Sequence, residues 1–165
     1  MTRRIAALLA LLLPAAAWAA VKTLPPEEAV ELAEGAGAGM AKAAELNGYP
    51  GPKHVLELAE PMELTPDQHR AAAALFHGMQ AEARALGARM LEREAALDRL
   101  FAERRAQPAE VEALVREIAA LRGELRFVHL RTHFEMAGLL TPHQALPYAA
   151  LRGHAHGHGG GGHKH

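Results

Sequence analysis

Two long rows of apolar residues, separated by one proline, constrain this chain more than any other feature. In each row the apolar side chains recur every three or four residues, which is the period of one helix face. Pro108 lies between the rows and marks a turn followed by a new helix start. The pattern therefore predicts an antiparallel helical hairpin. The first row is Leu75, Phe76, Met79, Ala83, Leu86, Met90, Leu97 and Phe101, and the second is Val111, Leu114, Ile118, Leu121, Leu125, Val128, Thr132, Met136 and Leu139.

Composition favours an all-α fold. Aromatic residues make up only 4% of the chain, whereas strands favour aromatic and β-branched side chains. We expect a long antiparallel helical hairpin flanked by two short helices, one within residues 52–62 and one beginning near residue 141. A single hairpin with one apolar face per helix leaves surface unburied, so we expect a homodimer. The chain has no cysteine, which excludes a disulfide scaffold, a thiolate zinc site and a cysteine nucleophile.

The first nineteen residues are predicted to be a secretory signal peptide. Arg3 and Arg4 precede a short apolar run, and Ala17-Trp18-Ala19 fits the pattern of a cleavage site, so we expect cleavage after Ala19. The run is too short to span a bilayer, which needs ~20 apolar residues. The mature protein is then exported to the periplasm. Its formal charge falls from −1 to −3 with the loss of two arginines, which argues against a nucleic-acid partner.

The mature chain divides into three parts. Residues 20–51 form an acidic arm rich in Gly and Pro, which we expect to pack little apart from a short helix near 27–34. Residues 52–152 form the helical domain. Residues 153–165 form a Gly/His tail that we expect to be disordered, because it has almost no apolar side chain to bury.

A capping motif occurs twice around the two rows. Leu64-Thr65-Pro66-Asp67-Gln68 and Leu140-Thr141-Pro142-His143-Gln144 share the pattern Leu-Thr-Pro-x-Gln. In each, the threonine suits the N-cap, the proline suits the first helical position, and the glutamine stands where a capping box requires Glu or Gln.

Two such motifs around a helical hairpin, behind a signal peptide, resemble the Spy/CpxP family of periplasmic proteins, which is named for its LTxxQ motifs. The resemblance covers about residues 52–152. It implies an all-α protein, usually dimeric, from a group that includes ATP-independent chaperones, zinc-resistance-associated proteins and heavy-metal sensors. We therefore expect a metal-binding protein of envelope stress or heavy-metal resistance. Two alternatives stay open: a chaperone for unfolded clients, and a metal sensor that contacts a membrane-bound regulator. No catalytic motif or phosphate-binding loop is present, so we expect no enzyme.

Histidine is the residue type that points to a ligand. The chain contains eleven, and imidazole suits zinc, copper, nickel and cobalt. We expect a divalent transition metal, zinc first, to bind the tail with modest affinity and broad selectivity. A solubilising tail without metal is the alternative. The tail histidines are His154, His156, His158, His163 and His165.

A second candidate site lies on the second long helix. His129 and His133 are four residues apart, so they share one helix face and can chelate one ion. Antiparallel register places Glu82 within reach of them, with Glu94 as second choice. Met136 could add a sulfur ligand. Without a metal, the pair would be ordinary residues at the boundary of the apolar face.

The resemblance to metal-sensing relatives implies a further ligand at His54 on the short helix. Those relatives often carry a second histidine four residues later, where this chain has Leu58. We expect His69, His77 and His143 to be surface residues.

Overall fold

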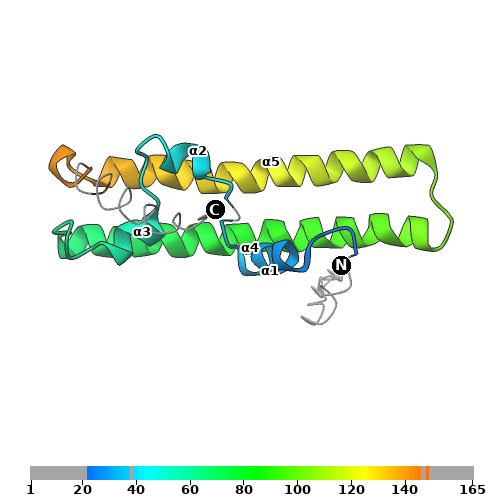
Figure 1. Ribbon diagram of the computed structural model, residues 1–165, viewed down its shortest axis with the longest axis horizontal. Helices are drawn as coiled ribbons and strands as arrows, with labels where there is room; N and C mark the ends of the chain where they lie inside the picture. Colours follow the sequence, from blue (N-terminus) through cyan, green and yellow to red (C-terminus); the bar gives the residue numbers. More distant parts are fainter. Residues whose placement is uncertain (1–21, 38, 146–147, 149–165) are drawn as a thin grey trace, which may run out of the picture.

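The computed structural model describes residues 22–37, 39–145 and 148, and every regular element among them is an α-helix. Three short helices precede two long ones (Figure 1). The all-α prediction is therefore confirmed. The chain continues helical at 142–145 after the second long helix. The helices are α1 (Pro26–Glu34), α2 (Lys42–Glu45), α3 (Pro52–Glu57), α4 (Pro66–Ala102) and α5 (Pro108–Leu139).

Proline marks the start of most of these helices. It occupies one of the first two helical positions in α1, α3, α4 and α5, where its fixed φ suits the helix and its missing N–H is not needed. At the start of α4, the Thr65 side chain accepts from Gln68 N while Gln68 Oε1 accepts from Thr65 N. The predicted first capping box is confirmed.

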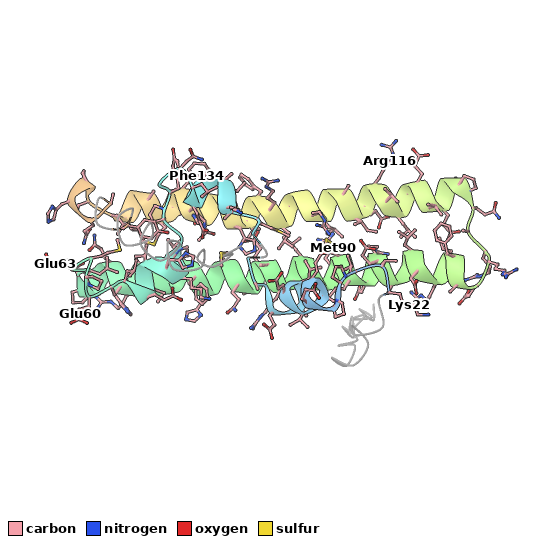
Figure 2. All side chains as sticks on the ribbon, in the orientation of Figure 1. Lys22, Glu60, Glu63, Met90, Arg116 and Phe134 are labelled. Carbon is pink, nitrogen blue, oxygen red and sulfur yellow. The ribbon has the colours of Figure 1, made fainter. Side chains whose placement is uncertain are left out.

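The long helices lie side by side along most of their length. Residues 103–107 turn the chain at the end of α4, and α5 runs back beside it (Figure 1). Met90 lies between the two helices and is fully buried (Figure 2). Ion pairs flank the contact, at Arg131–Glu82 (2.7 Å), Arg93–Glu117 (3.1 Å) and Arg89–Glu124 (4.0 Å).

The arm packs against the long helices, so the prediction that it would pack little is wrong. Ala29 and Leu32 of α1 are 4% and 2% exposed and join the main apolar core. Gly87 is the physical reason, because a methyl group there would lie 2.1 Å from the Leu32 carbonyl oxygen. The arm is also tied by polar contacts, including Arg122 to Glu28 at 2.6 Å.

A second apolar cluster lies where α3, the start of α4 and the end of α5 meet. Val55 is its contribution from α3 and is completely buried. The short helix is shorter than predicted: it ends at Glu57, and Leu58 and Ala59 are half-buried in the turn that follows. The buried members are Val55, Met62, Ala72, Met136 and Tyr148.

The two capping motifs contact each other beside this cluster. Gln68 Nε2 donates to Gln144 Oε1 (2.8 Å), and Gln144 Nε2 donates to Gln68 Oε1 (2.9 Å). The second amide hydrogen of each side chain goes to the carbonyl just before the other motif, at Leu139 and Glu63. Thr141 and Gln144 form the second predicted capping box. The two motifs were predicted as separate caps, whereas together they form one hydrogen-bonded clasp.

The predicted apolar rows are buried unevenly. Their central members are buried, but Phe101, at the end of the first row, is 59% exposed. Its neighbour Leu100 takes the inward place and is 7% exposed. The assignment of Phe101 to the core is wrong because the helix ends at Ala102, where none of the described elements covers the two long helices.

Candidate metal centre

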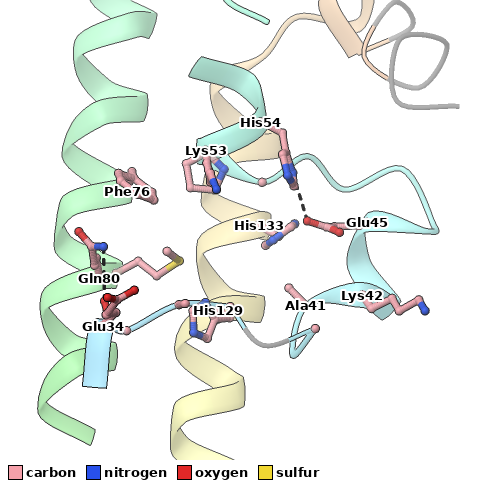
Figure 3. Close-up of a pocket in the computed structure, with 17 residues that line it drawn as sticks. Glu34, Ala41, Lys42, Glu45, Lys53, His54, Phe76, Gln80, His129 and His133 are labelled. Atoms are coloured by element: carbon pink, nitrogen blue, oxygen red, sulfur yellow. Dashed lines mark hydrogen bonds and ion pairs between the residues drawn. The ribbon is translucent and has the colours of Figure 1, made fainter. Parts of the chain in front are cut away.

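Three of the predicted histidines line one pocket. His54 comes from α3, and His129 and His133 come from α5 (Figure 3). The pocket is open, has a volume of about 540 Å³, and is walled by the α1–α2 segment and by α4. Glu45 of α2 lies on the same wall as His54. Residues more than eighty positions apart in the sequence thus meet here.

His133 is held in a defined orientation. It is 5% exposed, and its Nδ1 lies 2.9 Å from the Tyr49 carbonyl oxygen. A carbonyl oxygen can only accept, so Nδ1 carries a proton, and in the neutral form of the ring Nε2 is the nitrogen with the lone pair. The other edge of the ring rests on Gly51, where a methyl group would lie 2.9 Å from Cε1 and 3.0 Å from Nε2. Gly51 therefore makes the space that the ring occupies.

The Glu45 carboxylate lies beside His54. Glu45 Oε1 lies 3.2 Å from His54 Nδ1, and both side chains are about one quarter exposed. A methyl group on Gly51 would lie 3.7 Å from Glu45 Oε1, so the carboxylate also borders the space beside His133. Figure 3 shows Glu45 between the two rings. Glu45 is not among the predicted ligands, because it lies in the arm, which was expected to pack little.

His129 is the most deeply buried of the three. It is 2% exposed, and its Nε2 has no hydrogen-bond partner among residues 22–37, 39–145 and 148. Burial lowers the pKa of His129 below its usual 6.5, and the neighbouring His133 lowers it further. The ring is therefore neutral at neutral pH, and no group in the described part of the chain satisfies its Nε2. The prediction that His129 lies well inside the apolar face is confirmed.

The histidine and glutamate side chains of the pocket are chemically suitable ligands for a borderline metal ion such as zinc. Imidazole nitrogen and carboxylate oxygen are ligands that zinc, cobalt and nickel accept, and neutral imidazole is the form that binds. In the described part of the chain, however, no three His, Asp or Glu side chains stand close enough together to hold an ion. The donors come from three separate helices, α2, α3 and α5, so they would have to close in around a metal.

Three other predicted ligands lie elsewhere. Glu82 has the predicted position along α4, but its carboxylate pairs with Arg131 on the exposed flank of the helices. The Arg131 guanidinium carries a full charge at every relevant pH and pairs with this carboxylate, which does not line the pocket. Glu94 accepts a hydrogen bond from Thr23 (3.0 Å). Met136, proposed as a sulfur ligand, is buried in the second apolar cluster.

The remaining histidines divide into two groups. His69, His77 and His143 are exposed, as predicted. The five tail histidines, His154, His156, His158, His163 and His165, lie outside the described residues, as does the proposed cleavage site at Ala19.

None of the described helices is both long enough and apolar enough to cross a bilayer.

Comparison of the sequence with protein-family models gives no match. Neither a curated protein nor a solved structure matches the chain. The functional argument therefore rests on the residues of the pocket.

Proposed function

We propose that this chain is a periplasmic protein of metal or envelope stress, related to the Spy/CpxP family, that binds a divalent transition metal and is not an enzyme. Zinc is the first candidate, followed by copper, nickel and cobalt. The ordered site is the pocket of His54, His129, His133 and Glu45. The five tail histidines would supply weaker sites with little geometric selectivity.

One observation carries the proposal: among the described residues, the buried His129 Nε2 has no hydrogen-bond partner, and a second histidine lies beside it. An unsatisfied buried polar atom lowers the stability of a fold by about 1–3 kcal/mol. Its presence in a fold therefore requires an explanation. A metal ion would satisfy this nitrogen. The Tyr49 carbonyl on His133 Nδ1 supports the same reading, because metal-binding histidines commonly donate their other ring N–H to a carbonyl or carboxylate.

The test separates the pocket from the tail. In the mature chain, the five tail histidines are replaced by asparagine, and thermal unfolding is followed with and without zinc. Zinc bound only by the folded state stabilises by about 2.7 kcal/mol at a hundredfold excess over Kd. We expect the melting temperature to rise, and calorimetric titration to give one ion per chain.

Substitutions then assign the ligands. His129→Ala and His133→Ala should abolish the shift in melting temperature, and Glu45→Gln should weaken it. His77→Ala and Glu82→Gln are the controls, because His77 is exposed on α4 and Glu82 is paired with Arg131. If zinc, nickel, cobalt and copper all leave the melting temperature unchanged, the ordered site does not exist.

A second candidate function is that of an ATP-independent chaperone for unfolded proteins. The observation in its favour is the set of large apolar side chains left exposed on the long helices, including Phe101, Phe127 and Phe134. Suppression of client aggregation by metal-free protein, unchanged by His129→Ala, would favour this candidate over metal binding.

A further inference from the structure

The last residue that the structure describes lies at the edge of the histidine pocket. Tyr148 is 2% exposed, and its hydroxyl oxygen accepts a hydrogen bond from Gly51 N (3.3 Å). Gly51 also lines the pocket, where a methyl group on it would lie 3.0 Å from His133 Nε2. Gly51 thus has Tyr148 on one side and the His133 ring on the other. The part of the chain that follows Tyr148 therefore begins beside the pocket.

The histidines of α5 supply only part of a metal site. His129 and His133 line the same pocket from successive turns of α5 (Figure 3), and among the described residues His129 Nε2 has no hydrogen-bond partner. A structural zinc ion takes four protein ligands. No three described His, Asp or Glu side chains stand close enough together to hold an ion. An ion on this pair is therefore completed either by movement of α2 and α3 or by ligands from elsewhere in the chain.

The sequence after Tyr148 contains histidines with a spacing that suits one ion. His154, His156 and His158 alternate with alanine and glycine. In an extended chain, side chains two residues apart point to the same side, so these three imidazoles can meet one ion together. Imidazole is also the ligand type that α5 already provides, and zinc binds several of them at one site.

The distance along the chain suits delivery to the pocket. Six residues lead from Tyr148 to His154, and they span up to ~20 Å when extended. That length is enough to cross a pocket of about 540 Å³. One wall of the pocket also leaves room for a segment of chain, because methyl groups on Gly37 and Gly39 would meet no described atom within 4 Å.

We infer that His154, His156 and His158 fold back onto the pocket of the same chain and complete the coordination of the ion held by His129 and His133. The inference rests on the proposed metal function, since it adds ligands to the same site. It replaces an open pocket and a separate tail with one closed site. The position of the tail then depends on the metal: it is docked when zinc is bound and released when zinc is removed.

The affinity for zinc tests the added ligands. The zinc Kd of the mature chain is measured by competition with a chromophoric chelator. Replacing His154, His156 and His158 by asparagine should raise the Kd about a hundredfold, the lower end of the gain from tethering a second set of ligands. The control is His163→Asn/His165→Asn, which removes the same chemistry beyond four further glycines. It should change the Kd by no more than about twofold, because a longer connecting chain lowers the effective concentration.

The length of the connection tests delivery from the same chain. A spacer of roughly twenty Gly and Ser residues is inserted after Arg152, so that roughly twenty-six residues separate Tyr148 from His154. Effective concentration falls as the −3/2 power of length for a flexible connection, so the Kd should rise about ninefold with every ligand still present.

Trypsin gives a direct measure of docking, because Arg152 lies just before the three histidines. Zinc should slow cleavage after Arg152 in the wild-type chain. The matched control is His129→Ala at the same zinc concentration, in which the tail is unchanged and cleavage should stay fast.

Four outcomes overturn the inference. They are a triple asparagine variant with the wild-type Kd, a spacer variant with the wild-type Kd, a wild-type chain that binds two independent ions, and a tight site formed on mixing His129→Ala with the triple variant. The last would assign the ligands to the tail of a second chain. In each case, a rise in melting temperature with zinc would still support the proposed pocket. The absence of any such rise in the wild-type chain would refute the proposed function itself.

Discussion

The two ends of the α4–α5 pair differ in how completely they are buried. At the turn, no other described element packs on the pair: Phe101 is exposed, and Val111 and Leu114 are only half-buried. At the other end, α3 and the capping clasp close over the helices, and Val55 and Met136 are fully buried. One apolar face per helix is therefore not enough to exclude water from the contact between the two helices. Burial requires a third element, and the histidine pocket lies where short helices supply one.

The largest effect should come from a cavity in the end covered by α3. Met136→Ala removes a fully buried side chain from the second apolar cluster, so we expect a loss of about 2–5 kcal/mol in the free energy of unfolding. Phe101→Ala, at the turn, should change it by no more than about 0.5 kcal/mol. Urea denaturation of both variants gives the comparison, and equal losses would show that the two ends are equally packed.

A smaller effect should follow from lifting α1 off α4. Gly87→Ala places a methyl group 2.1 Å from the Leu32 carbonyl oxygen, so α1 must shift. We expect a loss of about 1–3 kcal/mol, with faster proteolysis of the arm. Gly78→Ala is the matched control, since its methyl group meets nothing within 4 Å and should stabilise by about 0.5–1 kcal/mol. Stabilisation by both substitutions would contradict the docking of α1.

The smallest effect concerns pH at the histidine pocket. Burial lowers the pKa of His129, so the unfolded chain binds this proton at a higher pH than the folded protein does. The free energy of unfolding must then fall as pH decreases through the usual histidine range, near 6.5. Metal-free protein should lose thermal stability between about pH 7.5 and 5.5, and His129→Leu should lose less. His77→Leu serves as the control, and identical pH profiles for all three proteins would refute the assignment.

Periodicity and capping chemistry were enough to predict the two long helices. The central residues of both rows are buried, and both capping boxes form as expected. These features depend on contacts within three or four residues, which a sequence displays directly. The burial of His129 followed from the same periodicity.

The arm could not be predicted in this way. Residues 22–51 have few large apolar side chains, and α1 docks because Gly87 leaves room for its backbone. The available signal in the sequence is Gly87 itself, a glycine within the first apolar row. Glu45 could not be predicted as a ligand for the same reason, because it belongs to the arm. Glu82 shows the converse: its position along the helix was correct, but Arg131 competes for the carboxylate.

The clasp between Gln68 and Gln144 requires glutamine at both of two distant positions. Each amide both donates to and accepts from the other, and each spends its remaining hydrogen on a backbone carbonyl. A glutamate at either position would turn a donor into an acceptor and set lone pair against lone pair, both across the clasp and at that carbonyl. Neither glutamine can therefore change alone without breaking the ring. In proteins descended from this sequence, the two glutamines, 76 positions apart, should therefore be retained together or replaced together.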